Sequence, residues 1–362
     1  MSDVQVDLMN QGNAQGEVAA YAAANGRLDI GRMRPYVGQD GRVYVTVHTG
    51  GDPKRKENYK TLAVNSPGTL RRDEWKQLDE AVLMIAEKRL GGFQDLIDNG
   101  LVYTLGNAMG TTVLEYHDVG DALVAELSMD AVTRAQGDRQ HYKTVYLPIP
   151  IIHADYEINQ RVLEASRSLG NPLDTTMAER AARKVSEKLE ALLFTDTSYA
   201  FGGGTIYSYV NHPQRNTLDL SKAWDDGTKT GKNIVDDVLE MKQESIEAFH
   251  YGPWMLYIPT SYETKLDEDY SDSKGTNTIR ERILAIAGIS GIRIVDTLPD
   301  DNVLLVQMTS DVVRLVRGLG VQNIQWQTEG GFVNKFKTIT IQVPQIRSDQ
   351  KGNSGLVHAT VS

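Results

Sequence analysis

The sequence predicts a protein of the α+β class, and three observations carry this prediction. A long helix is indicated at 175–194, where apolar residues recur at helical spacing on one face. Helical and strand-like patterns alternate over 234–316, which is typical of a compact α/β unit. The chain then ends in strand-like segments at 321–328, 335–343 and 356–361.

The first part of the chain is polar and locally basic. Residues 1–26 are small and polar, and residues 27–60 carry eight Lys or Arg against four Asp or Glu. We interpret residues 1–70 as an N-terminal arm, which either lies against an acidic neighbour or anionic content or is simply solvated. The alternation from Arg42 to Val47 predicts one strand within it.

The next segments predict a helix followed by a long hairpin. Trp75, Leu78, Val82 and Ile85 form one apolar stripe on a helix over 72–90, and Gly91 and Gly92 are expected to end it. Strand-like residues at 102–116 and 143–152 enclose a polar stretch. A ribbon of two strands is marginal in water by itself, so we expect this hairpin to lie on something else, such as another subunit.

The helix from Thr175 to Phe194 is the strongest of the chain. Asp174 or Thr175 is the expected cap, and Glu179, Glu187 and Glu190 are expected on its charged faces. Its apolar face is assigned to Met177, Ala181, Val185, Leu189 and Leu192. Residues 197–231 are predicted as loop. The α/β unit then reads as helices at 234–249, 261–266, 278–286 and 310–316 and strands at 254–258, 292–295 and 303–307.

Composition excludes several classes of protein. The 362 residues include no cysteine, which excludes disulfide scaffolds, thiol catalysis and thiolate metal sites. The net charge of −10 is unlike that of a typical nucleic-acid-binding domain, which is basic. We find neither a membrane-spanning run nor a signal peptide, and expect the protein to work where it is made.

Motifs for catalysis are missing from the sequence. None of the seven histidines lies four residues from another, and Gly202 to Gly204 lacks the residues of a phosphate loop. His153 and Asp155 resemble a base with its orienting carboxylate, but they are expected to start a helix, where such pairs cap or are solvated. We therefore predict no enzyme activity, no catalytic residues, no metal and no cofactor.

Five segments resemble the tailed-phage major capsid protein family, whose Hong Kong 97-type fold is shared with encapsulin shell proteins. These segments are Leu147 to Ile158, Pro172 to Ala178, Thr278 to Ile286, Val303 to Val313 and Ile341 to Ile346. The resemblance covers the chain from about residue 90 to the C-terminus.

The resemblance implies an extended hairpin that overlaps a neighbouring subunit, a peripheral domain with a spine helix, and an axial domain. The implied segments are 1–70 (N-terminal arm), 71–108 (helix and start of the peripheral domain), 109–145 (extended hairpin), 146–218 (peripheral domain with the spine helix), 219–330 (axial domain) and 331–362 (return strands of the peripheral domain).

The resemblance also implies a function. The chain is expected to assemble with itself, as hexamers and pentamers, into the icosahedral or prolate head of a tailed bacteriophage. The head would enclose double-stranded DNA without sequence-specific contacts or a membrane, with scaffold, portal and decoration proteins as possible partners. Assembly is expected in the host bacterial cytoplasm, and the product is the virion capsid. Two alternatives stay open: an encapsulin-like nanocompartment shell, and a soluble α/β enzyme or binding module.

The predicted hairpin lacks the residue needed for one form of covalent cross-linking. Some members of this fold join subunits through a lysine near the hairpin tip and an asparagine on a neighbour. From Asp118 to Tyr142 this sequence has no lysine, and its cations there are Arg134 and Arg139. An arginine guanidinium stays protonated and is a poor nucleophile. We therefore predict that Arg134 and Arg139 lie at a subunit interface as salt-bridge donors and that the shell is not cross-linked this way.

Overall fold

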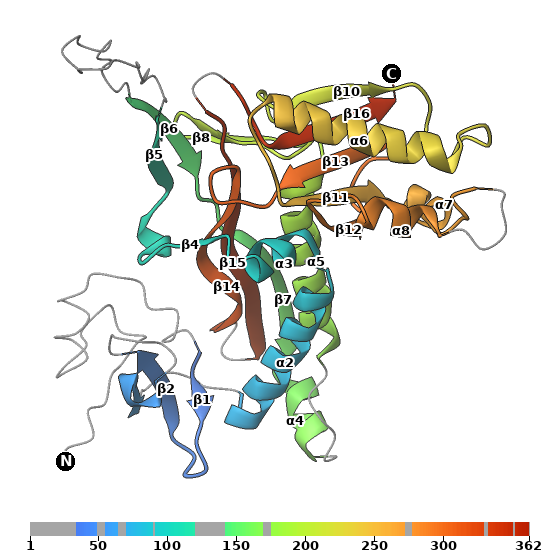
Figure 1. Cartoon of the computed structure of the whole chain (residues 1–362). Coiled ribbons are helices and arrows are strands. Elements are labelled where there is room, and N and C mark those ends of the chain that lie inside the picture. Colours follow the sequence, from blue (N-terminus) through green and yellow to red (C-terminus); the bar gives the residue numbers. More distant parts are fainter. Residues whose placement is uncertain are drawn as a thin grey trace, which may run out of the picture.

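The computed structural model describes residues 34–48, 55–63, 70–89, 91–119, 142–168, 175–271, 277–328, 332–349 and 352–361. Long strands and helices α2 and α5 form an extended body, and a second sheet with its helices lies at one end of it (Figure 1). None of the helices in these ranges has the length and apolar character needed to span a bilayer.

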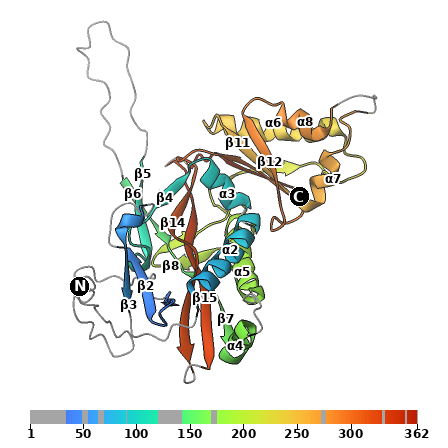
Figure 2. The same cartoon turned by 90° about the horizontal axis from the view of Figure 1, so that it is seen from below.

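The extended body is built on a four-stranded sheet with the order β4-β14-β15-β7. Strand β15 is buried without interruption over its last nine residues, and it pairs antiparallel with β14, the other long strand, with two irregularities in register. Helices α2 and α5 pack against this sheet and against each other, as Figure 2 shows. The elements are α2 (Arg72–Arg89), α3 (Gly91–Asp98), β4 (Val102–Thr104), β7 (Ile152–Asn159), α4 (Gln160–Ser168), α5 (Thr176–Phe194), β14 (Val313–Thr328) and β15 (Val333–Ile346).

The second sheet has five strands in the order β10-β16-β13-β11-β12. Its central strands bury both faces, because alternate residues point to opposite sides. On β13, Val303 and Leu305 face the core under helices α6 and α8, whereas Leu304 and Val306 face the extended body. The elements are β10 (Asn216–Leu220), α6 (Gly231–Glu247), β11 (Trp254–Pro259), α7 (Glu263–Leu266), α8 (Ile279–Leu284), β12 (Ile289–Val295), β13 (Asn302–Gln307) and β16 (Leu356–Val361).

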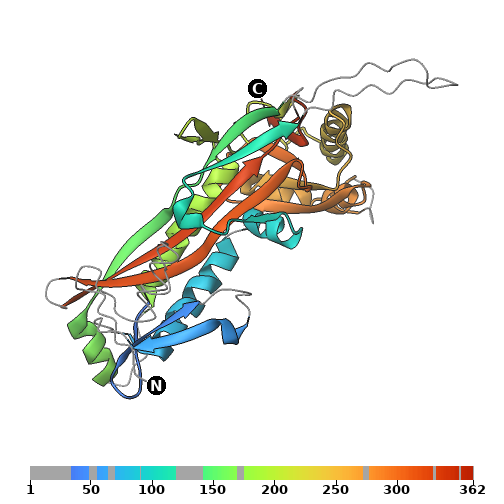
Figure 3. The same cartoon turned by 90° about the vertical axis from the view of Figure 1, so that its left-hand side faces the viewer.

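Three smaller sheets lie along the body (Figure 3). The N-terminal sheet contains β1 (Tyr36–Val37), β2 (Val43–His48) and β3 (Tyr59–Ala63), with a 3-10 turn at Lys56–Asn58. The ribbon pairs β5 (Val113–Val119) with β6 (Tyr142–Pro148), after a 3-10 turn at Ala108–Gly110. A short hairpin pairs β8 (Tyr199–Phe201) with β9 (Gly204–Ile206). The N-terminal region is thus partly a folded sheet rather than an arm throughout.

The structure confirms the mixed α+β class and corrects several elements. Residues 197–231 hold three short strands instead of only loop, and Gly91 begins α3 instead of only ending α2. His153 and Asp155 lie within strand β7, not at a helix start. Residues 310–316, predicted as a helix, lead into strand β14, because the β-branched run there pairs with β15.

Two strands belong to different sheets from those that the domain boundaries predicted from the sequence imply. Strand β14 was grouped with the α/β unit but lies in the four-stranded sheet, paired with β15 and β4. Strand β16 was grouped with the return strands but lies between β10 and β13 in the five-stranded sheet. Strand pairing is decided by distant contacts, which a local residue pattern does not report.

Helix α5 starts and ends almost where predicted, and most of its predicted apolar face is confirmed. Ala181, Val185, Leu189 and Leu192 are buried as predicted, whereas Met177 is 43% exposed. Ala178, Ala182 and Leu193, which the prediction omitted, are buried as well. Thr175 makes no capping bond to the backbone, and its hydroxyl donates to Glu179 (2.7 Å). Glu190, expected on a charged face, is 5% exposed. The buried face of α5 is therefore wider than the predicted stripe and includes Glu190, while Met177 lies outside it.

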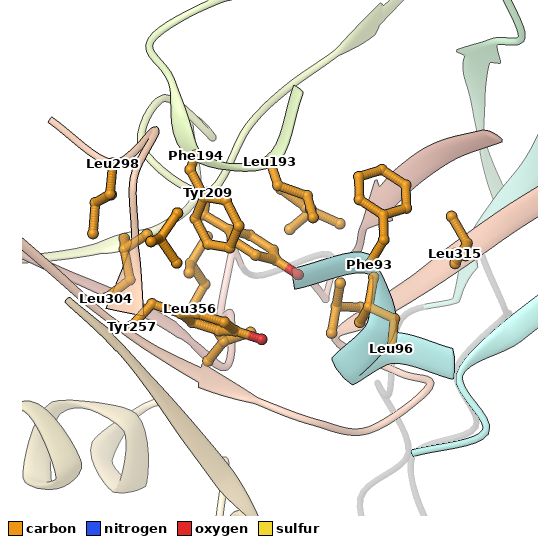
Figure 4. Close-up of a cluster of buried hydrophobic side chains, with 14 of the residues drawn as sticks. Phe93, Leu96, Leu193, Phe194, Tyr209, Tyr257, Leu298, Leu304, Leu315 and Leu356 are labelled. Atoms are coloured by element: carbon orange, nitrogen blue, oxygen red, sulfur yellow. The ribbon is translucent and has the colours of Figure 1, made fainter. Parts of the chain in front are cut away.

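Two cores meet along α5. Its first half packs with α2 and β7, and its second half packs into the cluster that joins the extended body to the five-stranded sheet. Figure 4 shows this second cluster, in which the Phe194 ring contacts Tyr209 and Tyr257 with centroid distances of 5.6 and 5.0 Å, and the two tyrosine rings stack on each other at 6.2 Å. One helix thus holds the two sheets together.

Buried polar groups complete this junction. The Glu190 carboxylate accepts a hydrogen bond from the backbone N–H of Gly92 (3.0 Å), at the start of α3. Asp95 of α3 forms an ion pair with Arg293 of β12 and accepts from the Tyr257 hydroxyl (3.2 Å). Burial raises the pKa of Glu190 to about 8, although hydrogen bonds from the backbone N–H groups of Phe93 and Gly92 act in the opposite direction. Burial also raises the pKa of Asp95, although Arg293 opposes this.

A first prediction tests the buried face of α5. Leu189→Asp should abolish soluble expression, because an unpaired carboxylate in this core costs an amount comparable to the stability of a whole domain. Lys188→Asp is the matched control, since Lys188 is exposed one position away, and it should express normally. Soluble yield and Tm report the difference, and equal losses in the two variants would contradict the assigned face.

A second prediction concerns the proton on Glu190. Its folded pKa of about 8 lies above its ordinary value of 4.5. The free energy of unfolding should therefore fall as the pH rises from about 4.5 to about 8, by at most about 5 kcal/mol. Glu190→Gln is neutral and keeps an oxygen for the Gly92 N–H. The Tm of the variant relative to wild type should increase from pH 5 to pH 8 and level off above.

Comparison with wild type removes the contribution of the groups around Glu190. Asp95, Arg293, Tyr209 and Tyr257 interact with Glu190 and stay unchanged in the variant. Glu187→Gln, on the exposed side of the same helix, is the control. Arg183 and Lys184 lower the pKa of Glu187, so this variant should show no gain at pH 8. A pH-independent difference between Glu190→Gln and wild type would rule out a protonated Glu190.

Candidate subunit interfaces

Arg134 and Arg139, the interface residues predicted from the sequence, lie outside the described residues. The structure describes the base of the same hairpin, up to Val119 on one strand and Tyr142 on the other. The interface analysis therefore rests on that base and on the other exposed surfaces of the described chain.

The ribbon β5–β6 has little core of its own. In the described part of the ribbon, buried residues occur only at Leu147 and Pro148, next to Ile149 beyond its end. Leu147 and Ile149 pack with Ile206, Val316, Ile341 and Val343 of the neighbouring strands. Above this base the residues are half-buried or exposed, as at Glu115 and Tyr146. The described part of the ribbon above its base therefore contributes few buried residues to the chain's own core.

A close backbone approach fixes the ribbon to the body. Gly204 of β9 lies so near β6 that a Cβ there would be 2.1 Å from the Tyr146 carbonyl oxygen. Any larger residue would push the two strands apart. Glycine at this position therefore sets the direction in which the ribbon leaves the body.

A cavity of about 430 Å³ opens beside the ribbon base. Its lining includes Tyr116, Tyr146, Tyr207, His212 and Pro344. Burial, with a smaller contribution from Arg215, lowers the pKa of His212 to about 4, so the imidazole is neutral at pH 7. Its Nδ1 accepts from the backbone N–H of Gln214 (3.3 Å). The lining combines aromatic, aliphatic and neutral polar side chains without an acidic or basic residue, which suits neutral side chains of another chain better than an ion.

The N-terminal sheet is docked on the outside of α2. The Trp75 indole donates to the Pro35 carbonyl (2.9 Å), and Arg34 forms an ion pair with Asp79. Its outer surface carries exposed cations at Arg42, Arg55, Lys56 and Lys60. The positive charge predicted for this region is therefore displayed on a folded sheet.

The one catalytic pair considered from the sequence lies on an open surface. His153 and Asp155 are 3.5 Å apart, both side chains are about half exposed, and Lys337 also pairs with Asp155 (3.4 Å). Within the described ranges, no three His, Asp or Glu side chains are grouped so as to hold a metal ion. His153, Asp155 and Lys337 form a polar cluster on the surface of the four-stranded sheet.

Sequence reasoning missed one exposed aromatic turn. Phe249 and Tyr251 follow α6 and are 72% and 67% exposed. The sequence placed Phe249 inside the helix. The Gly252-Pro253 pair that follows was a signal for an earlier helix end, because the residue before proline avoids the helical conformation.

Comparisons with known proteins agree with this architecture. Residues 64–359 match a family described as "Family of unknown function (DUF6260)". A type 1 encapsulin shell protein, EncA of Myxococcus xanthus (strain DK1622), is 26% identical over 222 residues, which cover 61% of this chain and 71% of the relative.

Solved structures of particle-forming proteins share the fold. A virus-like particle from Pyrococcus furiosus matches with a TM-score of 0.58 and 17% identity, covering 79% of this chain and 98% of that chain. The capsid of Myoviridae phage XM1 matches with a TM-score of 0.56 and 8% identity, covering 74% and 91%. The fold predicted from the sequence is confirmed: the chain belongs to the DUF6260 family and has the Hong Kong 97-type fold of phage capsids and encapsulin-like particles.

Proposed function

We propose that this chain is a structural shell subunit, the major capsid protein of a tailed bacteriophage. It assembles as hexamers and pentamers into an icosahedral or prolate head that encloses double-stranded DNA. The observation that carries the proposal is the extent of the match. The fold covers 98% of a virus-like particle chain and 91% of a phage capsid chain, so nearly the whole architecture of those chains is represented here.

The elements take distinct roles in this proposal. The four-stranded sheet with α5 is the peripheral domain and its spine, and the five-stranded sheet is the axial domain near the symmetry axes. The ribbon β5–β6 leads into the arm that overlaps a neighbour, with Arg134 and Arg139 as salt-bridge donors. Its weak core supports this role, because a ribbon with little buried area gains stability from an outside partner.

The remaining parts of the proposal concern partners and place. The subunit's main partner is itself; scaffold, portal and decoration proteins are further partners, and DNA contacts are not sequence-specific. Assembly takes place in the host bacterial cytoplasm, and the product is the virion. The subunit has no catalytic role, in line with relatives named as shell and capsid proteins.

An encapsulin-like nanocompartment shell is the second candidate, and the similarity to EncA favours it. A phage capsid is preferred because of the long segment before α2, which includes the N-terminal sheet. Encapsulins usually start with a short helix. The content of the particle decides between the two, since a capsid holds nuclease-protected DNA and a nanocompartment holds a cargo enzyme.

The proposal is tested by purifying the full chain and examining it by sedimentation and negative-stain microscopy, alone and with scaffold and portal proteins. Closed shells of uniform size are expected. A chain that stays monomeric at high concentration, even with those partners supplied, would contradict a shell function.

A third prediction concerns the hairpin tip. Val119 and Tyr142 are paired across the ribbon, so residues 120–141 can be replaced by a two-residue Asn-Gly turn that joins them. The shortened subunit should stay soluble with little change in Tm, because the buried contacts of the ribbon lie at its base. It should not close shells in the microscopy assay. Normal particles would show that the tip is dispensable for assembly.

A fourth prediction follows from the absence of lysine between Asp118 and Tyr142. Purified mature particles boiled in detergent with reductant should run as a single band near 40 kDa. Stability must then come from non-covalent overlap or from a second protein on the shell. A ladder of dimers, pentamers and hexamers would instead identify a cross-link through another lysine.

A further inference from the structure

Two arginines lie on one face of the sheet, at the start of strand β14 and just after the end of β15. Arg314 of β14 is directly opposite Gln345 of β15, and the Arg347 N–H donates to the Val312 carbonyl (2.7 Å). The register therefore places Arg347 diagonally across from Arg314, on the same face as Gln345. Diagonal neighbours of this kind are within reach of long side chains.

Both guanidinium groups are held in place by the chain itself. The Arg314 group lies over the Tyr103 ring, 4.6 Å from its centroid, and its Nε donates to the side-chain oxygen of Gln345. The Arg347 Nη1 donates to the Ser310 carbonyl (3.3 Å). The two planar groups are thus positioned before any ligand arrives, which lowers the entropy that binding must cost.

The two positive charges have no counter-ion within the chain. No Asp or Glu in the described ranges forms an ion pair with either arginine. Both carboxylate oxygens of Asp349, two residues after Arg347, accept from Asn353 instead (2.7 Å each). Asp311, three residues before Arg314, is exposed and stays apart from the pair. An anion is therefore missing from this part of the subunit.

Hydrogen-bond acceptors are missing there too. Gln345 is fully buried, and since its oxygen faces a group that can only donate, its amide nitrogen is left over. Neither this nitrogen nor the Arg347 Nε has an acceptor in the described part of the chain. Burial and the neighbouring Arg347 lower the pKa of Arg314, although it stays protonated at pH 7. Buried donors without acceptors are rare and costly, so this cluster calls for an explanation.

The cluster reaches the surface, and its chemistry selects the ligand. Tyr103 is 40% exposed, and Arg314 and Arg347 are half-buried. Planar guanidinium groups match the paired oxygens of a carboxylate or phosphate, to which they bind through two parallel hydrogen bonds. A cation would be repelled, and an apolar group would leave the donors unsatisfied.

We propose that Arg314 and Arg347 form a binding site for an oxyanion, with Tyr103 and Gln345 holding the first guanidinium group in place. The oxyanion is a carboxylate of a second copy of this chain or a free ion such as inorganic phosphate, which share the same recognition chemistry. The inference goes beyond the proposed shell function, because an ion can bind to the unassembled subunit.

Inorganic phosphate is the probe for this site. Replacing chloride with phosphate at constant ionic strength should raise the Tm of the unassembled wild-type subunit by about 2–4 °C more than that of Arg314→Gln or Arg347→Gln. The phosphate-dependent increment is compared rather than the Tm itself, so a change in basal stability does not affect the result. Arg317→Gln, at an exposed arginine of the same strand, is the matched control and should keep the full increment.

A conservative variant and a second measurement complete the test. Arg314→Lys keeps the charge but not the planar fork, so it should lose part of the increment even if a glutamine variant fails to fold. Wild-type subunit should broaden the phosphorus NMR signal of phosphate more than the variants do. Equal increments in wild type and variants would show only the general effect of phosphate on stability and would overturn the inference. Absence of any increment in wild type would do the same.

Assembly distinguishes the two sources of the oxyanion. If a carboxylate of a second copy fills the site, phosphate should compete with it and raise the concentration that wild type needs for assembly several-fold. Arg347→Gln should then assemble poorly in either buffer. If a free ion fills the site, phosphate should not inhibit wild type. Failure of wild type to form particles under any condition would refute the shell function, whereas the anion site would still stand on the increment in Tm.

Discussion

The four-stranded and five-stranded sheets are positioned by helix α5 and by the buried carboxyl group of Glu190 that it carries. The first half of α5 packs under the four-stranded sheet, and its second half enters the cluster shared with the five-stranded sheet. Glu190 binds the first turn of α3, and α3 in turn holds Arg293 through Asp95. Three segments far apart in sequence are thereby fixed at one junction, which sets the angle between the two parts of the molecule.

The sequence predicted the elements of this junction better than its contacts. Periodicity located α5 to within a residue, since a long amphipathic pattern is a strong signal. It assigned Met177 to the buried face and Glu190 to a charged one, and both assignments were wrong. The burial of Glu190 depends on α3, nearly a hundred residues earlier in the chain. A pattern within one helix cannot report a partner that another segment brings.

The sheet to which a strand belongs, and the surface features of the chain, also depend on contacts that a local pattern does not report. Strand β16 was located correctly, but its place between β10 and β13 depends on pairing with distant strands. The ribbon was predicted as an unsupported hairpin, and its described base confirms a pair of strands with few buried residues. The aromatic turn was missed, because a phenylalanine in the left-handed conformation at a helix end departs from local preference. Such departures are expected where function, rather than folding, selects the residue.

The exposed parts of this chain share a physical character that suits an assembling subunit. A net charge of −10 makes free subunits repel one another, which favours solubility over indiscriminate association. Attraction must then come from a few surfaces that gain more in contact than alone. The described part of the ribbon, with few buried residues, and the turn at Phe249 and Tyr251, with two exposed rings, both add little to the stability of the isolated chain. Concentrating attraction at such surfaces lets a subunit fold first and associate reversibly afterwards, and reversible association allows a closed shell to correct misplaced subunits.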